Sequence, residues 1–300
     1  MPTGTIIKAL SGFYYVAEGD SITRCKPRGV FRHEKTQPLV GDKVCFSVSE
    51  GSDGTITSIE PRKNFLVRPP VANIDQLIIV ISAVTPVADP FVIDRMISLC
   101  EFYGIEPVLC HNKADLAVNE ELVAVYEKAG YSVCIVSAET GQGIDKLTAL
   151  LAGKISAFAG NSGVGKSSII NCLYPTLQIK TGEVSDKLGR GRHTTRHVEL
   201  YRMPDGAMLA DTPGFSFFDP DVLISPDKDQ LPLTFREFRR YNGECRFHDC
   251  SHTKEQGCAV RAALSKGDIS ASRHASYCRL YEEAKKIKPW EREQLASTRK

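Results

Sequence analysis

Short runs in which apolar and polar residues alternate make up much of the first 69 residues. Alternation with a period of two is typical of strands that bury one face. Clusters of Gly, Asp and Ser, which favour turns, separate the runs. The pattern predicts strands over residues 5–10, 13–17, 21–25, 43–48 and 55–59. So many short strands in so small a segment predict a β-barrel of the OB-like or SH3-like kind.

From residue 70 the pattern changes to continuous apolar runs that alternate with segments of helical spacing. A continuous run such as residues 76–84 is typical of a strand that is buried on both faces. The runs predict strands over residues 76–84, 107–110, 133–136 and 155–159, and the spacing predicts helices over 91–103, 120–129 and 144–151. Strands that alternate with helices predict a parallel sheet with helices on both faces.

Towards the C-terminus, apolar residues recur at helical spacing in residues 233–240, 259–264 and 272–287. These changes of pattern predict a multidomain protein with an OB-like barrel (1–69), an α/β domain (70–221) and a helical domain (222–300). Residues 61–70 have Pro at both ends and several basic residues, and they are predicted to be a linker.

The chemistry of the α/β domain begins at a glycine-rich loop. Residues 160–167 read Gly-Asn-Ser-Gly-Val-Gly-Lys-Ser, the G-x-x-x-x-G-K-S pattern of phosphate-binding loops. Glycines let backbone N–H groups surround a phosphate, and the N-terminus of the next helix adds partial positive charge. We expect Lys166 to reach the β- and γ-phosphates and Ser167 to bind Mg²⁺. The predicted nucleotide-binding residues of this segment are Gly160, Asn161, Ser162, Gly163, Val164, Gly165, Lys166, Ser167 and Ser168.

Two other loops indicate which base the nucleotide carries. Asn112, Lys113 and Asp115 form the N-K-x-D pattern of GTP-binding proteins. The Asp115 carboxylate can accept from N1–H and the 2-amino group of guanine, whereas adenine offers neither donor, so the site would discriminate steeply. We expect Asn112 to support the loop and the Lys113 side chain to lie over the purine. Ser137 and Ala138 match the Ser-Ala loop, in which a backbone N–H meets guanine O6.

Two segments after the phosphate loop complete the expected GTP site. Residues 189–196, rich in Gly, Arg and Thr, predict a mobile switch loop. In this loop Thr195, with Thr194 beside it, is expected to give a hydroxyl to Mg²⁺ and to sense the γ-phosphate. Further on, Asp-Thr-Pro-Gly forms a D-x-x-G pattern, so we expect Asp211 to hold Mg²⁺ through water and the Gly214 N–H to meet the γ-phosphate.

The water that attacks the γ-phosphate needs a group to orient it. In many GTPases a glutamine after the D-x-x-G glycine has this role, but here the position is Phe215, which cannot hydrogen-bond to water. We therefore expect slow hydrolysis by the chain alone. His193 is the candidate for orienting the water once the switch loop is ordered. The predicted catalytic residues are His193, Lys166 and Thr195, and the alternative for His193 is that it only packs or contacts RNA.

The order of these motifs is unusual. N-K-x-D and Ser-Ala precede the phosphate loop, and the switch threonine and D-x-x-G follow it, whereas common small GTPases begin with the phosphate loop. The order predicts a circular permutation, which chain ends that lie close together make possible. As a consequence, the segment after D-x-x-G leads directly into the C-terminal domain.

The C-terminal segment contains a group of metal-ligand residues: Cys245, Cys250, His252 and Cys258. Three thiols and one imidazole at this spacing favour tetrahedral Zn²⁺. Four ligands from the protein leave no open position, so the site is predicted to be structural. His248 is a rival for the fourth position, and buried, unligated cysteines are the alternative to a metal site.

Composition and charge limit the setting of the protein. The chain is 42% hydrophobic and 25% charged, contains no run of 18 apolar residues and shows no signal-peptide pattern, so we expect a cytoplasmic protein that does not enter a membrane. Seven of the 10 cysteines are scattered, which fits a reducing compartment.

The formal net charge of +2 hides a difference between the predicted domains. Residues 1–69 carry 10 Lys and Arg against 7 Asp and Glu, residues 70–221 carry 12 against 18, and residues 222–300 carry 16 against 11. The two basic flanks suggest an anionic partner, although ordinary solvated side chains are the alternative. A nucleic-acid-binding barrel uses basic residues around an aromatic one. The first domain has Phe31 among Arg24, Lys26, Arg28, Arg32, His33 and Lys35.

With these features the chain resembles the RsgA family, the ribosome small-subunit-dependent GTPases A, which are circularly permuted bacterial GTPases. The resemblance covers nearly the whole chain and includes residues 190–195 (Arg-Gly-Arg-His-Thr-Thr), residues 211–215 (Asp-Thr-Pro-Gly-Phe) and the Cys-Cys-His-Cys group. It implies hydrolysis of GTP to GDP and phosphate that the 30S ribosomal subunit stimulates, in late maturation of that subunit. It also implies that the barrel and the zinc domain contact 16S rRNA, with Mg²⁺ and one Zn²⁺ per chain as cofactors. We expect a monomer.

Two other classes of function remain open. One is a GTPase whose basic flanks face a membrane or a protein, although neither terminus forms a strongly amphipathic basic helix. The other is an RNA-binding module that uses GTP only for folding, against which the full set of predicted Mg²⁺ and switch ligands argues.

Overall fold

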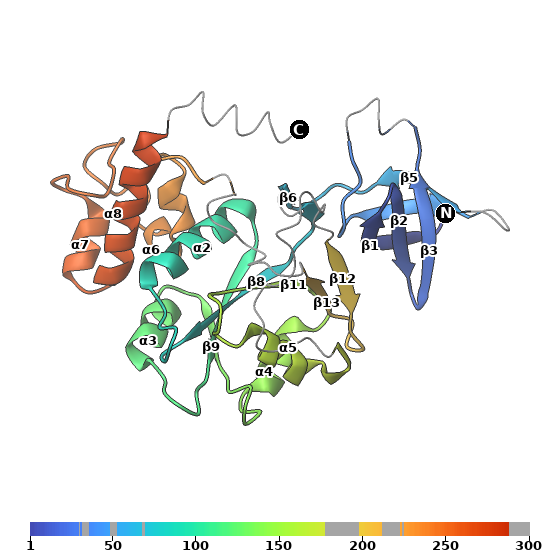
Figure 1. Cartoon of the computed structure of the whole chain (residues 1–300). Helices are drawn as coiled ribbons and strands as arrows, with labels where there is room; N and C mark the ends of the chain where they lie inside the picture. The colour runs from blue at the N-terminus through green and yellow to red at the C-terminus, as the bar shows by residue number, and fades with distance from the viewer. Residues whose placement is uncertain are drawn as a thin grey trace.

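The computed structural model of the chain describes residues 1–29, 31, 36–48, 53–67, 70–177, 198–211, 223 and 225–287 (Figure 1). A β-barrel, an α/β domain and a helical domain follow one another along the chain, as the sequence predicted. The barrel and the helical domain lie on opposite sides of the α/β domain (Figure 1).

The N-terminal barrel consists of β1 (Thr3–Leu10), β2 (Phe13–Glu18), β3 (Ser21–Pro27), β4 (Lys43–Ser47) and β5 (Gly54–Ile59). The strands pair in the order β1-β2-β3-β5-β4, and β1 also pairs with β4, which closes the barrel. Alternate residues of the strands point inward, so Ile6, Val16, Val44 and Ile56 are fully buried. The predicted OB-like barrel is confirmed.

The sheet of the α/β domain contains parallel strands β8 (Gln76–Ser82), β9 (Glu106–Asn112), β10 (Ser132–Ile135), β11 (Ile155–Ala159) and β13 (Met208–Asp211). Their order across the sheet is β10-β9-β8-β11-β13. Every residue of β8, the central strand, is buried, as its continuous apolar run predicted.

Helices cover both faces of this sheet. They are α2 (Pro90–Tyr103), α3 (Glu120–Lys128), α4 (Ile144–Leu151) and α5 (Lys166–Leu173), with a short 3-10 helix η1 (Pro175–Leu177) after α5. Leu77 and Ile79 of β8 share one core with α2 and α3. Ile78 and Val80, which point to the other face, share a second core with α4 and α5.

A strand that the sequence analysis did not predict joins the barrel to the α/β domain. β12 (Glu199–Arg202) pairs antiparallel with β13 and also meets β1 of the barrel. At this junction Lys8 Nζ lies 2.9 Å from Glu199 Oε2. The two domains therefore share one 11-stranded sheet.

The predicted linker contributes to a docked hairpin. β6 (Phe65–Val67) pairs with β7 (Pro70–Ala72), and Leu66 and Val71 are fully buried. Beside the hairpin, Arg62 Nε and Nη2 each donate at 2.7 Å to the fully buried Asp42 of the barrel. Losing one partner of a buried ion pair costs about 3–5 kcal/mol, so the pair holds this segment firmly against the barrel.

The C-terminal domain consists of η2 (Leu231–Thr234), α6 (Arg236–Arg239), α7 (Ala259–Ser265) and α8 (Ala271–Lys286). The sequence predicted one helix over residues 233–240, but the extended backbone of Phe235 interrupts it. Burial of the Phe235 ring against Tyr277 fixes this break, since the two ring centres are 5.3 Å apart. None of the described helices is long and apolar enough to cross a bilayer.

Candidate functional site

The predicted nucleotide-binding residues gather at one edge of the α/β sheet. β9, β10, β11 and β13 run parallel, so their carboxyl ends meet at the same edge. Asn112 is the last residue of β9, Gly160 directly follows β11, and Asp211 is the last residue of β13. Ser137 and Ala138 come shortly after β10. The sheet thus brings the three predicted loops together.

The phosphate loop has a backbone shape that only glycine permits. Gly160 and Gly165 have φ angles of 139° and 95°. A Cβ on Gly160 would lie 2.4 Å from the Val80 carbonyl oxygen, and one on Gly165 would lie 2.2 Å from Asn112 Nδ2. Such distances are far below van der Waals contact, so both positions require glycine.

Lys166 begins α5, and its ammonium turns back towards the phosphate loop. Nζ donates to the carbonyl oxygens of Gly160 at 2.7 Å and Asn161 at 2.9 Å. Burial lowers the pKa of this ammonium. A phosphate bound in the loop would stabilise the charge, which fits the predicted role of Lys166 at the β- and γ-phosphates.

Asn112 connects all three loops. Its buried side chain donates from Nδ2 to the Val164 carbonyl of the phosphate loop at 2.9 Å, and its Oδ1 accepts from the Ala138 N–H at 3.1 Å. The expected supporting role of Asn112 therefore has a geometric basis. In this structure the Ala138 N–H binds Asn112, and its contact with guanine O6 stays a prediction.

Asp115 is exposed at the rim of the site and is oriented by the Ser-Ala loop. The hydroxyl of Ser137, which is fully buried, donates to Asp115 Oδ1 at 2.5 Å and accepts from the Thr140 N–H at 3.2 Å. The Thr140 N–H donates its own proton to the Ser137 oxygen, so the single proton of the Ser137 hydroxyl is available for Asp115. This arrangement orients the carboxylate, and its contact with the guanine edge stays a prediction.

One wall of the site was not predicted. Lys113 Nζ donates to the Thr85 carbonyl at 2.9 Å, which ties the N-K-x-D loop to the segment after β8. The neighbouring Pro86 approaches the phosphate loop, since its Cδ would lie 3.6 Å from a Cβ on Gly163. A contact through a backbone carbonyl has no signature in the sequence, so pattern analysis could not find this wall.

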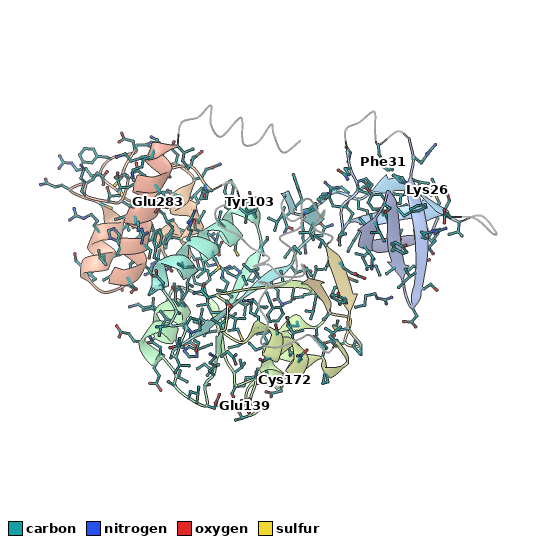
Figure 2. All side chains as sticks on the ribbon, in the orientation of Figure 1. Lys26, Phe31, Tyr103, Glu139, Cys172 and Glu283 are labelled. Carbon is teal, nitrogen blue, oxygen red and sulfur yellow. The ribbon has the colours of Figure 1, made fainter. Side chains whose placement is uncertain are left out.

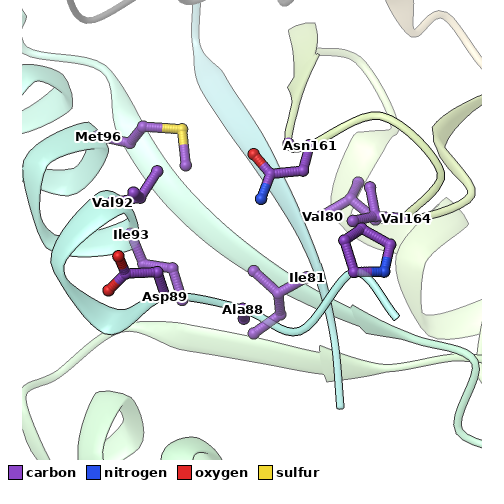
Figure 3. A pocket seen from close by; sticks show the side chains of 11 residues that line it. Val80, Ile81, Ala88, Asp89, Val92, Ile93, Met96, Asn161 and Val164 are labelled. Carbon is purple, nitrogen blue, oxygen red and sulfur yellow. The ribbon is translucent and has the colours of Figure 1, made fainter. Parts of the chain in front are cut away.

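A small apolar pocket lies beside the phosphate loop (Figure 3). Gly160, Asn161 and Val164 line it from the loop. Met96, with its neighbours on α2, lines it from the opposite side, and Asn161 faces the helix across the pocket (Figure 3).

The predicted switch residues His193, Thr194, Thr195 and Gly214 lie outside the described residues. The backbone of Asp211 ends β13, but its side chain is not among the described ones. Ser167 and Ser168 lie in the first turn of α5, where the predicted contacts with Mg²⁺ and phosphate require them. The roles of all these residues stay predictions.

The predicted metal ligands form one group in the C-terminal domain. The ligand atoms of Cys245, Cys250, His252 and Cys258 all lie within 4.8 Å of one another. His252 Nδ1 is 3.5 Å from the sulfur of Cys245 and 3.5 Å from that of Cys258, and these two sulfurs are 3.9 Å apart. Tetrahedral Zn²⁺ with bonds of about 2.0–2.3 Å requires ligand separations of about 3.5–3.8 Å. The group therefore fits zinc, and the exposed His248 lies outside it.

Helix α8 supports the backbone of the metal loop. His252 has a φ of 58°, a left-handed conformation that costs energy in a residue other than glycine. The ring Nε2 of His274 is 2.8 Å from the His252 carbonyl oxygen, and the Tyr277 hydroxyl donates to the Ser251 carbonyl at 2.7 Å. Both side chains come from α8, so this helix holds the metal loop in place.

Basic side chains lie on aromatic rings in both outer domains. The charged groups of Arg24 and Lys26 are each 4.9 Å from the centre of the Phe13 ring in the barrel. In the C-terminal domain, Arg246 lies over the exposed Phe247 ring, with 5.5 Å to its centre. Phe31, which was predicted to serve the basic loop as its aromatic residue, is instead buried in the hydrophobic core. Lys26 and Phe31 mark the barrel and Glu283 the opposite side of the molecule (Figure 2). The predicted Arg32, His33 and Lys35 lie outside the described residues.

Glycines give the phosphate loop its backbone shape, and Asn112 joins this loop to the N-K-x-D and Ser-Ala loops at the edge of a parallel sheet. Together these features define a phosphate-loop GTPase whose motifs are circularly permuted. The family model described as RsgA GTPase matches residues 59–221, and the one described as RsgA N-terminal domain matches residues 3–56. The chain belongs to the RsgA GTPase family and is a GTP hydrolase.

Curated relatives and solved structures agree over nearly the whole chain. A Bacillus cereus protein named small ribosomal subunit biogenesis GTPase RsgA is 45% identical over 96% of this chain and 99% of its own length. A Geobacillus protein of the same name is 46% identical over the same shares. The crystal structure of YjeQ from Thermotoga maritima has a TM-score of 0.81 at 33% identity, covering 96% of this chain and 99% of that one. The structure of YloQ, a circularly permuted GTPase, has a TM-score of 0.80 at 36% identity, covering 96% of each chain.

The role of Asp115 can be tested by changing its base preference. We predict that Asp115→Asn weakens GTP binding by about 100-fold or more and gains xanthosine triphosphate, because the new amide donates where xanthine carries a 2-oxo group. The amide oxygen can still accept from Ser137, so the loop keeps its support. Competition binding with both nucleotides measures the effect, and unchanged GTP affinity would show that another group reads the base.

The metal group can be tested by comparing two cysteines of the same domain. We predict that Cys250→Ala loses the one zinc per chain and loosens the C-terminal domain, while GDP affinity stays within about threefold because the nucleotide loops belong to the α/β sheet, which folds around its own core. Cys278→Ala is the matched control, since Cys278 lies outside the ligand group. Metal analysis decides: a wild-type protein without zinc, or equal zinc in both variants, contradicts the assignment.

Proposed function

We propose that this chain binds the small ribosomal subunit, assists its late maturation and hydrolyses GTP to GDP and phosphate faster when bound to it. One observation carries the proposal: relatives named small ribosomal subunit biogenesis GTPases align with 96% of the chain. An alignment of that length includes the barrel and the metal domain as well as the GTPase domain, so the parts outside the nucleotide site have counterparts in these relatives.

The proposed partner surface is 16S rRNA at both outer domains. Arginine and lysine groups on aromatic rings, as at Phe13 and Phe247, combine charge for phosphates with flat apolar surface for bases. Residues 70–221 carry more acidic than basic side chains, so the α/β domain attracts RNA phosphates less than the two outer domains do. This distribution supports an RNA that contacts the two outer domains. We further propose that the chain works in the cytoplasm as a monomer.

Within the nucleotide site we propose separate roles for the predicted residues. Lys166 would bind the β- and γ-phosphates, and Ser167, Thr195 and Asp211 (through water) would hold the Mg²⁺ that neutralises charge on them. Asp115 would select guanine. His193, as a neutral imidazole, would accept a hydrogen bond from the attacking water and so orient it. Because His193 belongs to the switch loop, docking on the subunit could accelerate hydrolysis by ordering that loop.

The proposal is tested by GTP turnover with and without purified 30S subunits. We predict slow turnover by the chain alone and an increase of at least about tenfold with 30S subunits, as when a partner orders a GTPase site. Isolated 50S subunits are the control and should not stimulate. Equal rates with and without 30S subunits, or equal stimulation by 50S subunits, would overturn the proposed function.

The same assay separates the role of His193 from binding. His193→Ala should keep its affinity for 30S subunits and lose most of the stimulated turnover. Full stimulation of this variant at equal 30S binding would mean that another group positions the water.

A further inference from the structure

Helix α2 has two contact faces that meet different parts of the molecule. At 100° per residue, Val92, Ile93 and Met96 lie on one side of the helix, and Asp94, Ser98 and Glu101 lie on the other. The first side lines the pocket beside the phosphate loop (Figure 3). The second side contacts the C-terminal domain. Helix α2 therefore lies between the pocket beside the phosphate loop and the interface with the C-terminal domain.

The pocket lies at the phosphate end of the nucleotide site. Lys166, the residue expected at the β- and γ-phosphates, donates to the carbonyls of Gly160 and Asn161, and these two residues also line the pocket. The base-reading loops around Asp115 do not line it. A displacement of α2 would therefore act first on the phosphate end of the site.

On the other face, Arg273 of α8 penetrates the interface with α2. Its side chain is 1% exposed, and it donates from Nη1 to Asp94 of α2 at 2.7 Å and from Nε to Glu237 of α6 at 2.7 Å. Burial opposes the charge of Arg273, but the two carboxylates outweigh it and raise the pKa of the guanidinium well above its usual range. The Tyr126 hydroxyl of α3 also donates to Asp94, at 2.8 Å.

Further contacts extend this interface along α2. The buried hydroxyls of Ser98 and Thr234 are 2.7 Å apart, and Glu101 accepts from Arg236 and from Arg239, each at 2.5 Å. Along the length of α2, polar side chains are thus bonded to the C-terminal domain. A buried network of this kind has few alternative arrangements, so it fixes the position of the helix.

The same helix α8 also holds the metal loop. Its His274 and Tyr277 bind the carbonyls of His252 and Ser251, whereas Arg273 binds Asp94. Contacts therefore run from the metal loop through α8 to α2, and the opposite side of α2 lines the same pocket as the phosphate loop. A displacement of α8 would therefore move α2 and, with it, one wall of this pocket.

We propose that Arg273 is a positioning residue of the GTPase site: through Asp94 it fixes α2, and it thereby couples the C-terminal domain to the phosphate end of the bound nucleotide. By reciprocity, a nucleotide with a γ-phosphate stabilises α8 more than GDP does. The inference rests on the GTPase activity of the chain and does not require the proposed ribosomal partner.

Hydrogen exchange of the full-length protein tests the coupling without ribosomes. In wild-type protein, amides of α8 should exchange about fivefold more slowly with a non-hydrolysable GTP analogue than with GDP. The triple variant Asp94→Asn, Glu237→Gln, Arg273→Met removes all three charges at similar volumes, a replacement that buried ion clusters often tolerate. In this variant the difference between the nucleotides should fall below about twofold, since only the contacts of Ser98 and Glu101 with the C-terminal domain remain.

The control is Lys128→Met, which removes a contact between α3 and the Gly267 carbonyl of the same C-terminal domain. It should keep the full difference between nucleotides, because Lys128 does not act through α2. A merely structural role of Arg273 would lower protection equally with both nucleotides. An undiminished difference in the triple variant, or no difference in wild-type protein, overturns the proposal.

Asp94→Asn alone serves as the second variant if metal analysis shows that the triple variant loses zinc. It keeps an acceptor for Arg273 and Tyr126 and removes the charge, so the difference between nucleotides should shrink at unchanged zinc content. An undiminished difference in this variant also overturns the proposal.

Discussion

The nucleotide site depends on one buried amide. Asn112 donates to the Val164 carbonyl and accepts from the Ala138 N–H, so a single side chain connects the phosphate loop, the N-K-x-D loop and the Ser-Ala loop. The connection also explains why position 165 is a glycine, since a Cβ there would clash with the Asn112 amide. Its geometry is independent of motif order along the chain: the three loops meet because parallel strands end at one edge. A circular permutation can therefore keep the site intact.

The barrel and the C-terminal domain are both firmly attached to the α/β domain that contains this site. The barrel continues the central sheet through the pairing of β1 with β12, and Arg62 donates to the fully buried Asp42 beside the connecting hairpin. The C-terminal domain is attached by the buried cluster around Arg273. Both attachments use charged or backbone groups that would be costly to leave unpaired, so neither domain is loosely tethered.

Much of this arrangement could be predicted from the sequence, because periodicity and loop motifs report local constraints. The barrel strands, the continuous run of β8, the three nucleotide loops and the metal group are of this kind.

What could not be predicted depends on contacts between distant segments. β12 is a short strand whose partners lie far away along the chain, and the residues before β6 resembled a linker because proline and basic residues dominate there. The buried position of Arg273 was equally hidden, since the sequence shows only one basic residue among many on a C-terminal helix. Similarly, Thr85 acts through its carbonyl, which every residue type possesses.

The affinity of GDP for Asn112→Ala is the most direct test of the central claim that one amide assembles the site. The substitution leaves the Val164 carbonyl and the Ala138 N–H without their partner, at a cost of about 3 kcal/mol, so the dissociation constant should rise by about 100-fold. Asn119→Ala, which removes the N-cap of α3 in the same domain, is the control and should leave GDP affinity within about threefold. A dissociation constant for Asn112→Ala as close to wild type as that of the control would contradict the account.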